Sequence, residues 1–199
     1  MLQVKQIVNR IYTSNSYLVF DDEYNYCWLI DIGDYEMVAD VIPNGKEVRG
    51  VFLTHTHFDH LYGINALHRD YPQCRVYTSV YGKQALYDEK MNFSKYHQSS
   101  LVYEGTDVGV LYDGDNIEIY PGIFLTAYET PGHCPSCLTY VLNNWVFTGD
   151  SFIFRVKVVT KLPKGDRFLA KESLEKIMSF SQGKMICPGH GNTGIIEKN

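Results

Sequence analysis

The sequence predicts a layered α/β protein, and three observations support that prediction. Short runs rich in aromatic and β-branched residues dominate the first third of the chain and return in its second half. Segments with apolar residues at helical spacing lie between these two groups, and a last one lies near the C-terminal end. No internal repeat, low-complexity tract or linker interrupts the 199 residues, so one domain over 1–199 is expected.

The first strands lead directly into the most unusual segment of the chain. Strands are expected at 17–20 (YLVF) and 26–33 (YCWLIDIG), separated by a polar turn. A strand of the buried type is expected at 48–54 (VRGVFLT), and it runs straight into HTHFDH at 55–60. The histidine-rich segment is therefore expected at the end of a strand.

The middle of the chain alternates helical patterns with one short strand. Helices are expected at 35–41, 61–72 and 81–90, and a short strand at 75–79. The segment 91–105 has no clear period and could act as a loop or lid. The second half returns to strands at 116–120, 123–130, 137–143 and 144–150, with a hairpin turn at Asn143-Asn144. A final helix is expected around 167–180, before a strand at 184–187.

Composition limits the classes of partner. Acidic residues exceed basic ones, 23 to 18, and no Lys/Arg cluster stands out, so nucleic-acid binding is not expected. No apolar run reaches the roughly 18 residues of a membrane span, and the N-terminal segment lacks the pattern of a signal peptide. The five cysteines are odd in number and widely spread, which favours reduced thiols in the cytoplasm. A small-molecule substrate is the expected partner, and the oligomeric state stays open.

The histidines are concentrated in loops that follow predicted strands. Five of the seven lie in such loops, accompanied by two aspartates and by glycine or proline: His55, His57, Asp59, His60, His133, Asp150 and His190. Clusters of His and Asp usually indicate metal binding or catalysis. His68 and His97 lie outside these loops, and we expect them to be ordinary surface residues.

The spacing within the first cluster favours two metal ions over one. In an extended segment, residues two apart point the same way, so His55 and His57 can bind one ion together. Asp59 and His60 are adjacent, so their side chains point in different directions unless the chain turns there. A helix beginning near residue 60 would supply that turn. A second ion needs further ligands, and later loops supply candidates.

The motifs resemble those of the metallo-β-lactamase superfamily. HTHFDH matches the HxHxDH pattern of that family, and TPGH around His133, TGD ending at Asp150 and PGHG around His190 follow in the family's order. LIDIG, which contains Asp31, resembles the strand-end motif that precedes the histidine cluster. The resemblance implies an αββα four-layer sandwich, with the metal site at one edge of the two sheets.

The resemblance also implies a role for each residue. His55, His57 and His133 would bind the first metal, whereas Asp59, His60 and His190 would bind the second. Asp150 would bridge the two ions, Asp31 would orient the histidine loop, and Asp59 would also act in catalysis by accepting a proton. The expected cofactor is a pair of divalent ions, with zinc as the first choice and iron or manganese as alternatives.

The implied activity is hydrolysis of a small ester-like substrate by a metal-bridging hydroxide. A bridging aspartate at Asp150 argues against a true β-lactamase, and His57 argues against the diiron flavoprotein type. The small glyoxalase II-like hydrolases remain, so a thioester or a lactone is the expected substrate. The alternative is an oxidoreductase resembling the mononuclear iron persulfide dioxygenases, and the third is a non-catalytic metal-binding domain.

Three features depart from the glyoxalase II pattern. CPSC at 134–137 places Cys134 and Cys137 beside a metal ligand, where we expect packing first and a redox switch or second metal site as the alternative. The loop after Asp150 carries four cations that could face an anionic substrate, although solvent exposure is expected for each: Arg155, Lys157, Lys161 and Lys164. Tyr96 and Tyr103 could line a pocket for a flat or apolar acyl group, although a half-buried structural role is the default expectation.

Overall fold

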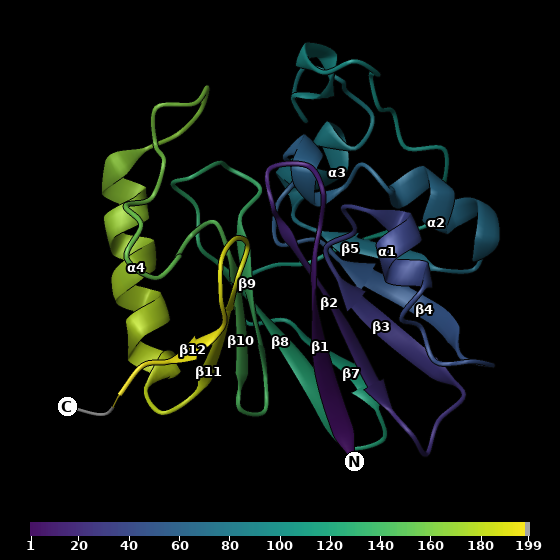
Figure 1. Cartoon of the computed structure of the whole chain (residues 1–199). Helices are drawn as coiled ribbons and strands as arrows, with labels where there is room; N and C mark the ends of the chain where they lie inside the picture. The colour runs from purple at the N-terminus through teal and green to yellow at the C-terminus, as the bar shows by residue number, and fades with distance from the viewer. Residues whose placement is uncertain (198–199) are drawn as a thin grey trace.

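Two six-stranded β-sheets lie face to face in the computed structural model, which describes residues 1–197 (Figure 1). The first sheet has its strands in sequence order: β1 Leu2–Val8, β2 Asn15–Asp21, β3 Tyr26–Ile30, β4 Glu47–Phe52, β5 Arg75–Thr78 and β6 Val108–Val110. The second sheet runs in reverse order from β12 to β7: β12 Gly194–Ile195, β11 Met185–Pro188, β10 Trp145–Gly149, β9 Leu138–Leu142, β8 Ile123–Glu129 and β7 Asn116–Tyr120.

Helices cover the outer face of each sheet. Figure 1 shows α1 (Tyr35–Ala39), α2 (Ile64–Asp70) and α3 (Val80–Ala85) beside the first sheet, and α4 (Arg167–Ser181) beside the second. The αββα four-layer sandwich implied by the sequence motifs is therefore confirmed. Within residues 1–197, no helix combines the length and apolar character that crossing a bilayer requires.

Alternation along the strands divides the core into two layers. On β2, Tyr17 and Val19 pack into the cluster between the two sheets, whereas Leu18 packs into the cluster beneath α1 and α2. The cluster between the sheets is rich in aromatic side chains, which need hydrogen-bond partners for their polar ends. Trp28 donates to the backbone oxygen of Ile119 at 2.9 Å, so this bond ties the first sheet to the second.

Parallel pairing places the functional loops at one edge. β3, β4 and β5 are parallel neighbours in the first sheet, so the loops that follow them emerge on the same side. β10 and β11 are parallel neighbours in the second sheet, so the loops after them also share an edge. The segments carrying Asp31, 55–60, Asp150 and His190 follow these strands, which is why residues far apart in sequence meet.

Several element boundaries differ from the sequence prediction, and three strands were not predicted. The helix expected over 81–90 ends at Ala85, and the helix expected over 61–72 begins only at Ile64. The strands β6 and β12 were not predicted because they have only three and two residues. β1 was not predicted although its LQVKQIV sequence alternates apolar and polar residues as a strand does. The segment 91–105 is irregular apart from a 3₁₀ turn at Ser94–Tyr96.

Candidate metal centre

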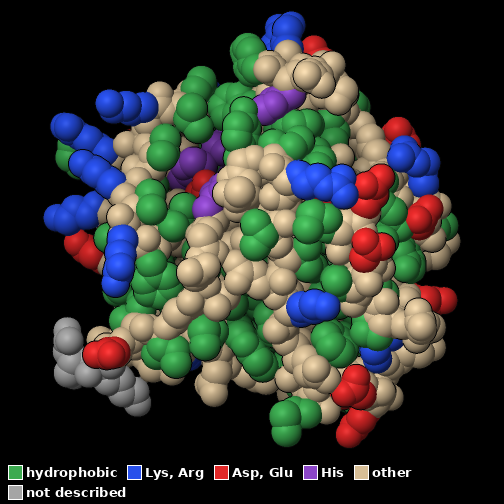
Figure 2. Space-filling view, in the orientation of Figure 1, with side chains coloured by type: hydrophobic (Ala, Val, Ile, Leu, Met, Phe, Trp, Pro, Cys, Tyr) green, Lys and Arg blue, Asp and Glu red, His purple; other side chains and the backbone are tan. Residues whose placement is uncertain are grey.

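Seven side chains from four loops converge at the edge shared by the two sheets. They come from the loops after β4, β8, β10 and β11: His55, His57, Asp59, His60, His133, Asp150 and His190. Their ligand atoms form three overlapping groups whose members lie within 4.8 Å of one another. Figure 2 shows histidine and acidic side chains at the bottom of a hollow that hydrophobic residues surround.

A tight turn explains how four residues of the single loop 55–60 can face one centre. A 3₁₀ helix spans Phe58–His60, and the backbone N–H of His60 donates to the oxygen of His57 at 3.0 Å. The backbone oxygen of His60 accepts from Ile32 at 2.9 Å, which fixes the turn against the end of β3. The turn expected near residue 60 is therefore present, as a 3₁₀ helix.

The first group contains His55, His57 and His133. Nε2 of His133 lies 2.9 Å from Nδ1 of His57. Nε2 of His55 is buried and has no hydrogen-bond partner, although the His55 ring packs against both other rings. A buried polar atom without a partner is costly, and a cation shared by these nitrogens would satisfy it.

The second group contains Asp59, His60 and His190, and Asp150 lies between the two groups. Nε2 of His190 lies 3.3 Å from Nε2 of His60 and 3.3 Å from Oδ2 of Asp59. Oδ1 of Asp150 lies 3.6 Å from His60 Nε2, whereas its Oδ2 lies 3.6 Å from His133 Nε2. One carboxylate thus faces both histidine groups, and its buried Oδ1 has no hydrogen-bond donor.

The outer nitrogens of four histidines are already engaged, which leaves their inner nitrogens free for a cation. Nδ1 of His60 lies 3.0 Å from Oδ2 of Asp31, and Nδ1 of His133 and His190 lie 2.8 and 3.0 Å from backbone oxygens. The Thr54 hydroxyl donates to Asp31, so its oxygen accepts from Nδ1 of His55. Each bond selects the tautomer with its lone pair on Nε2, as a metal ligand requires. The residues present therefore fit divalent metal ions.

Burial and mutual charge shift the pKa values of the metal-free site. Burial, and then the neighbouring histidines, hold the pKa of His55 well below its usual value, so this ring is neutral. Burial alone would lower the pKa of His60, but the carboxylates of Asp59, Asp31 and Asp150 outweigh it and raise the pKa to about 10. Burial would raise the pKa of Asp59, but His60 and His190 hold it far below its usual range. The site thus combines an ionised Asp59 carboxylate with a histidine that must lose a proton before it can bind a metal.

An apolar cleft of about 510 Å³ opens above these residues. Aromatic side chains form much of its wall: Tyr12, Phe58, Phe93, Tyr96 and His97. Tyr96 lines the cleft, whereas Tyr103 is buried in the core beneath α2, which agrees with the structural role expected by default. His97 is not an ordinary surface residue, because its ring stacks on Phe58 with centroids 4.2 Å apart. Neither placement has a local sequence signal, since both depend on how the irregular 91–105 segment folds back.

The basic loop and the cysteines differ in their relation to the site. Arg155, Lys157 and Lys161 are exposed, as expected, whereas Lys164 also borders a second cavity beside His57. Figure 2 shows Lys and Arg side chains along the edge next to the histidines. Cys134 and Cys137 are buried and free, with their sulfur atoms 3.2 Å apart.

A family model described as the metallo-beta-lactamase superfamily matches residues 10–190 of this chain. The chain belongs to the metallo-beta-lactamase superfamily. Solved structures agree on the fold of this superfamily member. A structure titled BLEG-1 B3 metallo-beta-lactamase matches with a TM-score of 0.87 and 23% identity, over 96% of this chain and 93% of that one.

Two further structures are similar across nearly the whole chain. TTHA1623 in a di-iron-bound form matches with a TM-score of 0.80 and 24% identity, over 96% of this chain and 94% of that one. ETHE1 from Myxococcus xanthus matches with a TM-score of 0.71 and 24% identity, over 96% and 76%. At these identities the likeness establishes the shared fold, and the activity of this superfamily member has to be argued from its own site.

Proposed function

We propose that the protein is a metal-dependent hydrolase that cleaves a small thioester or lactone with two divalent ions, zinc being the first choice. The observation that carries the proposal is the position of Asp150 between the two histidine groups. Its Oδ1 lies 3.6 Å from His60 Nε2, and its Oδ2 lies 3.6 Å from His133 Nε2 and 3.5 Å from His190 Nε2. Such a carboxylate suits two ions held a few ångströms apart, and two groups of three further ligands surround it.

The chain's own residues prepare the site for hydrolysis. Ions bound there would lower the pKa of water to about 7 and polarise a carbonyl oxygen. Asp31 and Thr54 hold the imidazoles of His60 and His55 in the ligand orientation. Asp59 lines the cleft, and we assign its carboxylate to accept a proton as the leaving group departs.

The cleft supports a small organic substrate. Its wall is mostly apolar and aromatic, which suits the organic part of a thioester or lactone. The net charge of −5 gives no basis for nucleic-acid binding. We also propose a cytoplasmic location, which the five free cysteines support.

The test combines metal content with a substrate panel. Protein expressed with zinc, iron and manganese available is analysed by elemental mass spectrometry and then assayed with thioesters, lactones and a cephalosporin. About two ions per chain with thioester or lactone turnover supports the proposal. Cephalosporin turnover alone would assign a β-lactamase. One iron per chain with oxygen consumption on a persulfide would assign the oxidoreductase resembling the persulfide dioxygenases.

A further inference from the structure

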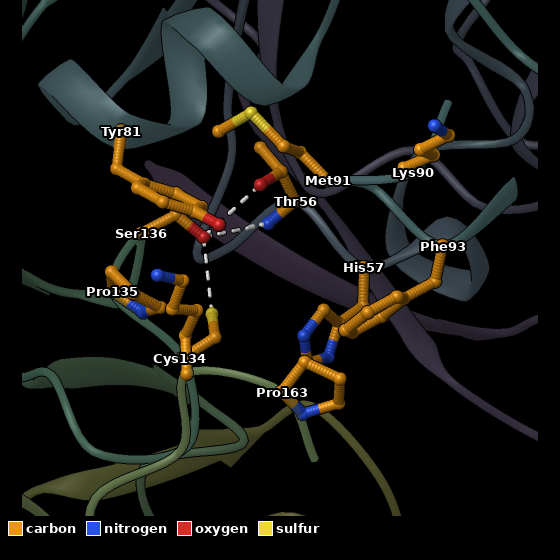
Figure 3. Close-up of a pocket in the computed structure, with 11 residues that line it drawn as sticks. Thr56, His57, Tyr81, Lys90, Met91, Phe93, Cys134, Pro135, Ser136 and Pro163 are labelled. Carbon is orange, nitrogen blue, oxygen red and sulfur yellow. Dashed lines mark hydrogen bonds between the residues drawn. The ribbon is translucent and has the colours of Figure 1, made fainter. Parts of the chain in front are cut away.

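A second cavity, of about 170 Å³, lies beside the metal centre on the side of His57 (Figure 3). Its apolar lining comes from Tyr81, Met91, Phe93, Pro135 and Pro163. We call it the side pocket. Buried Ser136 and Thr56 lie at its base, where the Ser136 hydroxyl oxygen accepts from the backbone N–H of Thr56 at 3.1 Å. The polar groups of this base are thus engaged with one another. Lys90 and Lys164 also border the pocket, and most of its remaining surface is apolar.

Three residues separate the side pocket from the main cleft. His57, Phe93 and Pro163 line both cavities and therefore form the wall between them. The Phe93 ring packs against the His57 ring with centroids 4.8 Å apart, and Figure 3 shows the two rings together with Pro163. Met91 and Tyr81 line the side pocket but not the main cleft, so they lie on the other side of this wall.

Phe93 is held in this wall by a strained backbone. Its φ of 64° and ψ of 2° are left-handed, which is a rare conformation for a bulky residue. Buried neighbours impose it. Asn92 donates to the backbone oxygens of Ala85 and Leu101 at 3.0 Å and accepts from the N–H of Ser94 at 2.9 Å. A surface loop under no constraint would relax, so the network fixes the aromatic ring beside a metal ligand.

We propose that the side pocket is the acyl subsite of the enzyme and that Phe93 is its specificity-determining residue. The substrate's unbranched or flat hydrocarbon group passes along Phe93 and ends against Met91 and Tyr81. This inference rests on the proposed hydrolysis, and it narrows the substrate to esters or thioesters with an apolar acyl group longer than acetyl.

The expected selectivity follows from apolar burial. Each methylene removed from water contributes about 0.8 kcal/mol, which corresponds to about a fourfold rise in kcat/KM. The metal-loaded enzyme is assayed with acetyl, butyryl and hexanoyl thioesters of N-acetylcysteamine. A hexanoyl-to-acetyl ratio in kcat/KM of at least ten is expected, and a flat or falling series would overturn the proposal.

A variant that fills the side pocket locates the selectivity. Met91→Trp narrows the pocket from a residue that does not line the main cleft, so the hexanoyl-to-acetyl ratio should fall at least tenfold. Phe124→Trp, at an exposed position on β8, is the size-matched control and should keep the ratio of the unmodified protein. If Met91→Trp folds and keeps that ratio, the acyl group lies elsewhere.

A binding measurement separates this inference from the proposed function. Calorimetry of the metal-loaded protein with acetate and hexanoate compares the two acids without any turnover. Tighter binding of hexanoate that Phe93→Ala abolishes supports the subsite even if no thioester is hydrolysed. Equal binding of the two acids would reject the subsite, whether or not hydrolysis is found.

A separate observation concerns Cys134 and Cys137. Their sulfur atoms are 3.2 Å apart and buried, yet Cys134 borders the side pocket, through which a small oxidant can arrive. A disulfide needs a sulfur separation of about 2.05 Å, so only a small local movement is required. Cys134 directly follows His133, whose Nε2 faces the metal centre.

We infer that these two cysteines form a reversible disulfide that weakens metal binding at His133. Hydrogen peroxide is the oxidant: one sulfur attacks a peroxide oxygen and releases water, giving a sulfenic acid. The second sulfur then displaces the hydroxyl group, which leaves as a second water with the remaining thiol proton. Two thiols are oxidised, one peroxide is reduced, and a dithiol reductant reverses the reaction.

The test counts thiols and metal together. After brief peroxide treatment and removal of the oxidant, the denatured protein should show three thiols in place of five, and the folded protein should retain less metal. Cys137→Ser should keep its metal under the same treatment, and Cys74→Ser, remote from the site, should behave like the unmodified protein. Five thiols after treatment, or three thiols with full metal content, would overturn the inference.

Discussion

The carboxylate of Asp31 lies 3.0 Å from Nδ1 of His60, on the side of the ring opposite the metal centre. The same carboxylate accepts from the backbone N–H and the hydroxyl of Thr54, both at 2.7 Å. Through Thr54 it also reaches Nδ1 of His55. One buried side chain thus orients a ligand from each of the two predicted metal groups.

Replacing Asp31 should weaken the metal centre without removing a ligand. In Asp31→Asn the amide keeps the shape of the side chain but loses the charge that faces His60. Loss of such an outer partner typically costs 10–100-fold in metal affinity, and that range is expected here. A competition titration with a chelator measures it. Asp34→Asn removes a buried carboxylate that pairs with Arg10 outside the site, so it should retain normal affinity.

Removing Asp59 tests the group assigned to catalysis. Asp59→Ala should lower kcat by about 10²–10⁴-fold, the range that general acid–base groups contribute. The fold should persist, because Asp59 lies in the wall of the cleft and not in the core. Circular dichroism and metal analysis accompany the assay. Asp107→Ala, at an exposed ion pair with Arg75, is the control. A folded, metal-loaded Asp59→Ala protein with undiminished activity would contradict the assignment.

Metal loading should release protons at pH 7. Neighbouring carboxylates outweigh the effect of burial and raise the pKa of His60 to about 10, so its ring is protonated in the metal-free protein. A cation needs the Nε2 lone pair, so binding expels that proton and becomes tighter as the pH rises toward 10. Calorimetric titrations in two buffers of different ionisation enthalpy count the protons. At least one proton per chain is expected, and a count of zero would mean that His60 is neutral before binding.

The same shift predicts how the metal-free protein responds to pH. The folded pKa of His60 lies above its ordinary value of 6.5, so the protonated ring stabilises the fold. That contribution is fully present below about pH 6.5 and disappears as the pH rises through about 10. Urea unfolding of the metal-free protein at pH 6.5 and pH 10 should show the loss, while the metal-loaded protein should show a smaller one. Equal stability of the metal-free protein at both values would contradict the charge arrangement at His60.

The sequence predicted which residues form the candidate metal site better than it predicted which side chains surround that site. His133 and His190 could be placed because each lies in a short loop, with glycine and proline, after a predicted strand. The pairing of Asp150 with both histidine groups followed only from the family resemblance. The position of Phe93 could not be predicted, because its left-handed backbone is imposed by hydrogen bonds from Asn92 to residues seven and nine positions away. Backbone propensities depend on neighbours in the sequence, whereas the position of Phe93 depends on residues that are neighbours only in the folded structure.

A substitution at Gly189 should disturb the metal centre without replacing any of the proposed ligands. A Cβ at this position would overlap Oδ1 of Asp150 and lie 2.9 Å from Cε1 of His60. Gly189→Ala must therefore push the Asp150 carboxylate away from its place between the histidine groups, and we expect the metal content to fall from the proposed two ions toward one. Gly191→Asn, two residues later, is the matched control. A Cβ there meets open space, and asparagine tolerates the φ of 77°. Full metal content in a folded Gly189→Ala protein would mean that Asp150 is not held between two ions.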